Sequence, residues 1–250
     1  MVNRAPLSAV IITLDAASQL PECLAALAFC DEIVVVDSGS SDGTVELARQ
    51  RGARVINQDW LGYGPQKQFA VERASHDWVL CVDADERVTP ELRASILAVP
   101  PEQTFHAYRF ARCNRFMGRY LRHGEGYPDW SLRLFDRRHA RWSDDVVHEK
   151  VVADGEVGTL AGDLLHDSAE SLDSYLAKQN RYTTLAAADA LARGKRAGAA
   201  RLLLSPLLRF FKFYFLRLGF LDGVPGLVHT LIGCQNSFAK YAKMLAKDKP

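Results

Sequence analysis

Three acidic residues stand together where a buried strand is expected to end. Asp83 and Asp85 are two positions apart, Glu86 follows them, and the apolar run 78–82 (WVLCV) precedes them. Carboxylates crowded in this way repel one another, and a hard divalent cation with oxygen ligands relieves that repulsion. A cation that also contacts a diphosphate would neutralise a nucleotide leaving group. The alternative interpretation is a solvated acidic turn that caps a helix beginning near 89–91.

The elements that must position these carboxylates alternate between strand and helix patterns. Apolar, β-branched runs that predict strands are separated by segments with helical periodicity, and these runs lie at 7–13, 32–37, 53–56 and 78–82. This βαβ alternation predicts a parallel, doubly wound sheet whose ligand lies beyond the carboxyl ends of the strands. Thr13 and Asp37 stand at the same predicted edge as Asp83, which makes them candidates for ligand binding.

Length and composition limit the function classes. The chain has 250 residues, 48% of them hydrophobic and 24% charged, which is ordinary globular composition and excludes disordered and collagen-like chains. A net charge of +1 provides no overall field for nucleic acid, so no nucleic-acid partner is expected. Five cysteines without a C-x-x-C pair predict reduced thiols, and the lack of a secretory signal pattern predicts a cytoplasmic protein.

Two motifs at this edge resemble a known enzyme family. The first is VVVDSGSSDGT at 34–44, and the second is LCVDADE at 80–86. Together they resemble the nucleotide-sugar-binding half of inverting glycosyltransferases of family 2, which have the GT-A fold. The resemblance implies an α/β fold with a Rossmann-like nucleotide-sugar-binding sheet and an acceptor-side α+β half. At the first strand end that family usually has T-x-N-E, whereas this chain has Thr13-Leu14-Asp15-Ala16.

The same resemblance implies roles for the strand-end residues. Thr13, Asp37 and Asp83 would hold the base and ribose of the nucleotide-sugar donor, while Asp85 would ligate Mn²⁺ or Mg²⁺. Lys67 and Arg73 are candidates for contacting phosphate, with a solvated helix face as the alternative for each.

Two later blocks resemble the acceptor side of a subgroup that builds the lipopolysaccharide core. These are YPDWSLRLF at 127–135 and VHEK at 147–150. Sugar transfer needs a carboxylate that takes the acceptor proton, and Asp129 is the first choice, with Glu149 second. Trp130 could stack on an acceptor sugar or be part of the core, and Asp129 could instead be a turn residue after proline.

Two more side chains have open roles. Arg133 could bind the diphosphate or an acceptor phosphate through its planar guanidinium, or it could pair with Asp136. His166 is a candidate extra metal ligand, and a structural histidine is the alternative.

A basic, apolar segment lies near the C-terminus. Residues 190–221 contain seven Lys or Arg and no Asp or Glu, interleaved with leucine and aromatic residues. This pattern predicts a helix lying on an anionic membrane surface, so the protein would be peripheral at the inner face of the plasma membrane. A helix buried against the sheet domain or a second subunit is the alternative.

The sequence thus predicts a GT-A domain at 1–168 and a C-terminal helical, membrane-associating extension at 169–250. The domain divides into a nucleotide-sugar-binding half (1–100) and an acceptor half (101–168). We expect an inverting, metal-assisted hexosyltransferase that moves glucose from UDP-glucose to lipopolysaccharide inner core. The alternatives are transfer to polyprenyl phosphate or another lipid-linked envelope glycan, and a membrane-bound nucleotide-binding scaffold without catalysis.

Overall fold

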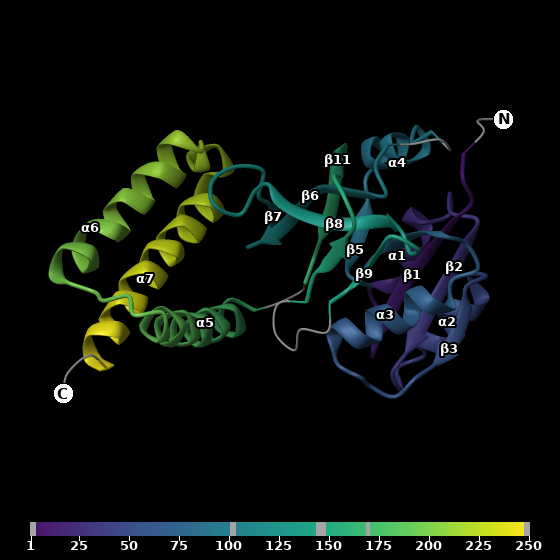
Figure 1. The fold of residues 1–250 in the computed structure, drawn as a ribbon, viewed down its shortest axis with the longest axis horizontal. Helices are drawn as coiled ribbons and strands as arrows, with labels where there is room; N and C mark the ends of the chain where they lie inside the picture. Colours follow the sequence, from purple (N-terminus) through teal and green to yellow (C-terminus); the bar gives the residue numbers. More distant parts are fainter. Residues whose placement is uncertain (1–3, 101–103, 144–148, 169–170, 248–250) are drawn as a thin grey trace. The chain divides into compact units, whose positions relative to one another are not determined.

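The computed structural model describes residues 4–100, 104–143, 149–168 and 171–247 (Figure 1). The chain forms two compact units, one made of Met1–Arg112 with Asp129–His166 and the other of Cys113–Pro128 with Asp167–Pro250. This division places the boundary before the C-terminal helices at 166/167, close to the predicted 168/169, and it differs from the predicted one at an internal segment. Residues 113–128 belong to the unit that contains the C-terminal helices, and not to the sheet unit.

Four parallel strands form the predicted nucleotide-binding part of the sheet. They run in the order β3-β2-β1-β4 and comprise β1 (Leu7–Thr13), β2 (Glu32–Asp37), β3 (Arg54–Asn57) and β4 (Trp78–Cys81). Their register places Thr13 beside Asp37, and Asp37 beside Asn57. The parallel α/β sheet is therefore confirmed, and the carboxyl ends of its strands meet at one edge.

Helices cover both faces of this parallel sheet. One core cluster joins the β1 side chains Ala9 and Ile11 to α1 (Leu20–Ala26), α2 (Thr44–Gln50) and α4 (Pro90–Leu97). The other joins Val10, which points to the opposite face, to α3 (Tyr63–Arg73). Burial on both faces explains why the strands are continuous apolar runs and not alternating ones.

Later strands extend the sheet and reverse its direction. The order continues from β4 through β8, β6 and β11 to β5, with β8 antiparallel to both β4 and β6. These elements are β5 (Glu86–Val88), β6 (Ala107–Phe116), β7 (Arg119–Tyr120), β8 (Asp129–Asp136), β9 (Ala140–Trp142), β10 (Val151–Ala153) and β11 (Val157–His166). Asp129 is the first residue of β8, so its interpretation as a turn residue is wrong. Residues 144–148 lie outside the described ones.

Glu32 joins four segments at the amino edge of the sheet. Its carboxylate accepts hydrogen bonds from Ser8 Oγ (2.6 Å), Ser75 N (2.7 Å) and Ser75 Oγ (2.8 Å), and it pairs with Arg54 (2.9 Å). Partial burial by itself raises the pKa of Glu32, but these donors outweigh it and lower the pKa to about 2. A depressed carboxyl pKa stabilises the fold above the unfolded-state value, and this stabilisation disappears as the pH falls toward 2.

We therefore expect Glu32→Gln to lower the free energy of unfolding by about 2–3 kcal/mol at pH 7. The deficit should shrink between about pH 5 and pH 2, because the wild-type carboxylate becomes protonated there. Urea unfolding of the wild type and the variant across this pH range measures the deficit. Glu72→Gln, which changes an exposed glutamate in the same way, is the control. An unchanged deficit at pH 2.5 would contradict the assignment.

The second unit is built from helices around α7. Helices α5 and α6 both pack on α7 (Figure 1), and the elements are α5 (Leu172–Ala192), α6 (Ala199–Phe210), the π-helix η1 (Phe211–Leu216), the 3₁₀ helix η2 (Gly219–Asp222) and α7 (Gly223–Lys247). None of the residues of α6 or η1 is buried. No single helix among the described residues could cross a membrane by length and composition; a pair bent by 72°, 199–216 with 219–247, passes that test jointly.

Candidate functional site

The turn after β4 is held in shape by its own hydrogen bonds. The backbone N–H of Glu86 donates to the carbonyl of Asp83 (2.9 Å), and the Glu86 carboxylate accepts from the backbone N–H of Asp83 (2.9 Å). Glu86 is fully buried. It is the first residue of β5 and pairs with His166, the last residue of β11. The turn therefore presents its two aspartates from a fixed backbone.

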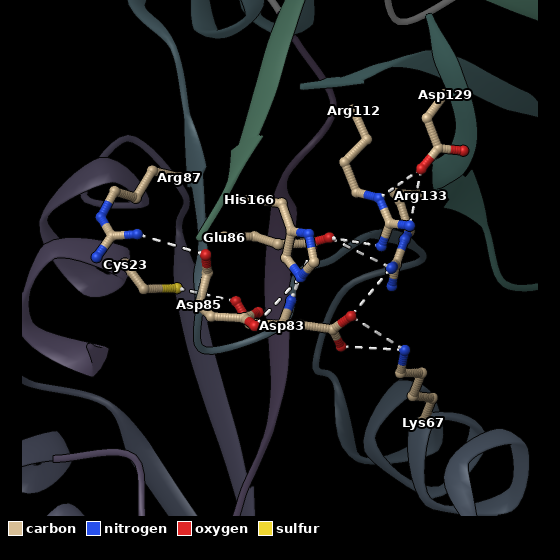
Figure 2. Close-up of polar contacts among 10 residues, drawn as sticks. All are labelled: Cys23, Lys67, Asp83, Asp85, Glu86, Arg87, Arg112, Asp129, Arg133 and His166. Atoms are coloured by element: carbon tan, nitrogen blue, oxygen red, sulfur yellow. Dashed lines mark hydrogen bonds and ion pairs between the residues drawn. The ribbon is translucent and has the colours of Figure 1, made fainter. Parts of the chain in front are cut away.

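Asp83 lies between two cations (Figure 2). Its carboxylate oxygens are 3.0 and 3.2 Å from Lys67 Nζ on α3, and Arg133 Nη2 on β8 donates to Oδ2 at 3.0 Å. Burial by itself raises the pKa of Asp83, but Arg133 and Lys67 outweigh it and hold the pKa below its usual range. Asp83 is therefore ionised, and Lys67 is a buried partner of the cluster, not part of a solvated helix face.

Arg133 is the central cation of the cluster. Its side chain is 7% exposed, its Nη2 is also 3.4 Å from Glu86 Oε1, and its guanidinium lies 5.3 Å from the centre of the Trp142 ring. Its Nη1 is buried without a hydrogen-bond partner in the described structure, beside a cavity of about 10 Å³, which is room for one water molecule. The predicted pairing with Asp136 is wrong, because Arg138 binds that carboxylate (2.6 Å).

Glu86 adds a fully buried carboxylate next to the partly exposed Asp83. Its Oε1 is 3.5 Å from Arg112 Nη1 as well as near Arg133. Burial and the neighbouring Asp83 charge raise the pKa of Glu86, although Arg133 and Arg112 oppose this. The Arg133 guanidinium therefore contacts two carboxylates whose pKa values shift in opposite directions, that of Asp83 downward and that of Glu86 upward.

Asp85 points away from Asp83, toward β11 (Figure 2). Its Oδ2 lies 3.2 Å from His166 Nε2, and the two side chains are 24% and 21% exposed. The expectation that Asp83 and Asp85 converge on one cation is therefore wrong, since Asp83 is held by Lys67 and Arg133. A carboxylate oxygen and an imidazole nitrogen at this separation, both partly open to solvent, can supply two ligands to a divalent cation.

Asp129 and Trp130 extend the site along β8. The register pairs Asp129 with Arg112 of β6, whose Nε and Nη2 lie 2.9 and 2.8 Å from Asp129 Oδ2. Trp130 is 48% exposed and contacts the Arg109 guanidinium at 5.1 Å from the ring centre, so it is not a core residue. Arg112 thus connects Asp129 to the Glu86 end of the cluster.

Glu149 lies just before β10, at the edge of a described segment. It is half-buried, and the contacts described for the Asp83–Arg133 cluster do not include it. Its preceding motif residues, 147 and 148, lie outside the described residues.

Asp37 organises the loop after β2. Its carboxylate accepts hydrogen bonds from Thr13 Oγ1 (2.8 Å), Gly39 N (3.0 Å), Ser40 N (2.8 Å) and Ser40 Oγ. Although burial opposes it, these donors lower the pKa of Asp37. The loop borders a 490 Å³ cavity lined by Asp37, Gly39, Ser40, Val45, Asn57, Gln58 and Asp59. The structure therefore brings Thr13 and Asp37 together beside a cavity of nucleoside size.

Two members of the cluster had no individual predicted role, and Glu86 was named only as part of the acidic turn. Arg112 and Glu86 connect Asp129 to Arg133, and only the pairing of β6 with β8 brings Arg112 to this place. The sequence around Arg112 does not distinguish this arginine from any other arginine in an amphipathic strand. Glu86, the last residue of the D-A-D-E motif, could have been predicted as a site residue, because it is a carboxylate at the start of a buried strand.

Comparison with known proteins agrees with this geometry. The sequence profile described as Glycosyl transferase family 2 matches residues 8–149. The lipopolysaccharide core biosynthesis glycosyltransferase LpsC of Rhizobium meliloti is 34% identical over 254 residues, covering 98% of this chain and 93% of that protein. An uncharacterized glycosyltransferase of Rickettsia felis is 31% identical, covering 95% and 89%.

Among solved structures, the mannosyltransferase PcManGT from Pyrobaculum calidifontis, in complex with GDP-Man and Mn²⁺, has the same fold. Its TM-score is 0.57 at 18% identity, covering 99% of this chain and 89% of that one. The predicted GT-A architecture is thereby confirmed. The profile match and the relatives that span nearly the whole chain show that this protein belongs to glycosyltransferase family 2.

Proposed function

We propose that this glycosyltransferase moves glucose from UDP-glucose, with inversion, to an acceptor sugar of the lipopolysaccharide inner core. The observation that carries the proposal is the sequence of groups along one sheet edge: a nucleoside-sized cavity at Asp37, the Asp85–His166 pair, and Asp129 with the exposed Trp130. The similarity to LpsC, named for lipopolysaccharide core biosynthesis, supports the choice of acceptor.

The donor nucleotide would occupy the strand ends. Thr13 and Asp37 shape the 490 Å³ cavity, where the base and ribose would lie, and Asp83 would contact the ribose from its place between Lys67 and Arg133. Those two cations also give this end of the site positive charge that favours a diphosphate.

Asp85 and His166 would hold Mn²⁺ or Mg²⁺. Their oxygen and nitrogen atoms lie 3.2 Å apart and face each other from the end of the turn and the end of β11. The cation, when bound, would neutralise the negative charge of the departing diphosphate. The solved fold relative with GDP-Man and Mn²⁺ is consistent with such a requirement.

Asp129 would take the proton from the acceptor hydroxyl. It stands at the start of β8 next to Trp130, whose exposed ring offers a face for an acceptor sugar. Arg112 binds one carboxylate oxygen and so orients the side chain. Glu149 is the second candidate for this role.

Titration calorimetry with UDP tests the donor site. We expect UDP binding to strengthen with Mn²⁺ in the wild type, and this gain to be lost in Asp85→Asn, because the amide is a poorer metal ligand than the carboxylate. Glu91→Gln, an exposed acidic residue of α4, is the matched control. Absence of UDP binding under every condition would remove the nucleotide-sugar proposal itself.

Sugar transfer identifies the acceptor. Membranes from cells with a truncated lipopolysaccharide core, incubated with enzyme and labelled UDP-glucose, should incorporate label into the core fraction. Label in a polyprenyl-phosphate fraction would favour the alternative acceptor. UDP binding without turnover on any envelope lipid would favour the scaffold alternative.

We further propose that α6 and η1 bind the anionic inner face of the plasma membrane. Leu207, Leu208 and Leu216 are 66–68% exposed, and Lys212 and Arg217 stand among them. Apolar side chains with adjacent cations suit insertion at the headgroup level of an anionic bilayer. The absence of acidic residues in 190–221 strengthens the same attraction.

Flotation with phosphatidylglycerol-containing liposomes measures this attachment. We expect the wild type to float and a Leu207→Gln/Leu208→Gln variant to bind at least about tenfold more weakly, because burial of each leucine is worth about 1.5–3 kcal/mol. Leu185→Gln changes an exposed leucine on α5 in the same way and should change little. A wild-type protein that stays at the bottom of the gradient at moderate salt would disprove the attachment.

A further inference from the structure

A basic cavity lies within the helical unit. It has a volume of 660 Å³ and is bordered by the end of α5, the loop 193–198, the first turn of α6 and the last third of α7. Four cations line it: Lys195, Arg196, Arg201 and Lys240. None of the described residues that line it carries a carboxylate.

The loop that carries two of these cations is braced by hydrogen bonds. Lys195 N donates to the Ala190 carbonyl (2.9 Å), and Arg201 Nη1 donates to the Arg196 carbonyl (3.1 Å). Beneath the cavity, Ala190 and Met244 are buried in a small apolar cluster that joins α5 to α7. The cations are therefore gathered by a packed structure and not by a free tail.

The positive charge of this cavity favours binding of an anion. Four cationic side chains line one space, and an anion bound there would pair with several of them at once. The first turn of α6 adds backbone N–H groups, because its cap residue, Gly198, has no side chain to satisfy them. A phosphate monoester, with a charge of about −1.5 to −2 and three acceptor oxygens, suits such a set of donors.

A second cavity of 300 Å³ adjoins the first and shares Lys240 and Tyr241 with it. Its other lining residues are Ala186, the Arg209 guanidinium, which pairs with Glu125, and a set of amides, hydroxyls and an aromatic ring from Gln179, Tyr182, Thr183, Ser205, Asn236 and Ser237. Asn236 and Gln179 are hydrogen-bonded to each other (2.8 Å), as are Ser205 and Ser237 (2.7 Å). Paired amides and hydroxyls of this kind can exchange bonds with the hydroxyls of a sugar.

We propose that the two cavities together bind a phosphorylated saccharide, with the phosphate at Lys195, Arg196, Arg201 and Lys240 and the sugar in the adjoining groove. The inference deepens the proposed function, since a phosphate-bearing acceptor glycan is the intended ligand. A membrane lipid headgroup offers the same phosphate chemistry without the sugar, and the polar groove favours the saccharide.

Calorimetry with glucose 6-phosphate in EDTA tests the proposal without donor or metal. We expect glucose 6-phosphate to bind at least about tenfold more tightly than either glucose or inorganic phosphate, because only it fills both cavities. Arg201→Gln and Lys240→Gln should each weaken binding about tenfold, because each removes one charged hydrogen-bond donor to the phosphate. Asn236→Ala should weaken glucose 6-phosphate but leave inorganic phosphate unchanged.

Arg193→Gln is the matched control. It removes the same charge from the same loop, but Arg193 pairs with Asp189 (2.9 Å) and does not line the cavity. Equal affinity for inorganic phosphate and glucose 6-phosphate would overturn the proposal, as would binding only to vesicles containing phosphatidic acid. Loss of UDP binding would affect the proposed function alone, so the two failures are distinguishable.

Discussion

Asp129→Asn is expected to lower kcat by about 10²–10⁴-fold while UDP affinity stays near the wild-type value. A positioned general base contributes a factor of this size, and an amide cannot accept the acceptor proton. Asp129 lies on β8, outside the residues that line the cavity at Asp37, so donor binding should not depend on its charge. Steady-state transfer rates and calorimetric UDP titration, measured on the same preparation, give the two quantities.

Glu149→Gln is the matched control, because it changes the other candidate carboxylate in the same way. If Asp129 is the base, this variant should keep most of its turnover. Near-normal turnover of Asp129→Asn together with an inactive Glu149→Gln would move the role to Glu149. Unfolding curves for both variants exclude a loss of fold as the cause, since Asp129 also pairs with Arg112.

Arg133→Met should lower the free energy of unfolding by about 3–5 kcal/mol at pH 7.5. Removal of one partner from a buried ion pair leaves an uncompensated charge, and here Arg133 serves both Asp83 (3.0 Å) and Glu86 (3.4 Å). Methionine keeps much of the volume beside Trp142, so a cavity contributes little. Urea unfolding measures the difference.

The loss in Arg133→Met should also depend on pH. The pKa of Glu86 is already raised by burial and by Asp83, and it should rise further without Arg133. A raised carboxyl pKa costs stability as the pH rises above the unfolded-state value, so the deficit should be smaller at pH 5 than at pH 7.5. Arg87→Met is the control, because its partner Glu22 is 73% exposed and such a pair is worth at most about 1 kcal/mol. A loss of less than about 1 kcal/mol in the free energy of unfolding of Arg133→Met would contradict the role of Arg133 as the main partner of Asp83 and Glu86.

The parallel half of the fold could be predicted because its strands carry strong local signals. The ranges 7–13 and 32–37 match β1 and β2 residue for residue, since apolar runs bounded by polar turns are characteristic of strands buried on both faces. The acceptor half was less predictable. The strand that begins at Asp129 is preceded by Pro128, and proline next to a polar residue resembles a turn until the pairing with β6 is known.

The site was predictable in its residue types and less so in its contacts. Asp85 and His166 are far apart in sequence, and the pairing of β5 with β11 brings them together. The spacing of Asp83 and Asp85 suggested convergence, but Lys67 and Arg133 draw Asp83 to the opposite side. Local spacing cannot show a cation that arrives from another strand, because that depends on the pairing of the whole sheet.

The helical unit is discontinuous in the chain, and this limits how it can be exchanged between enzymes. Segment 113–128 bonds to the C-terminal elements through Arg122 N and His123 N to Asp222 (3.0 and 2.8 Å) and through Glu125 to Arg209. A single recombination event near residue 168 would give the segment foreign helices as partners. Functional chimaeras therefore require two crossovers that transfer the segment and the helices together, and a fragment ending at 168 would leave these polar groups without their helical partners.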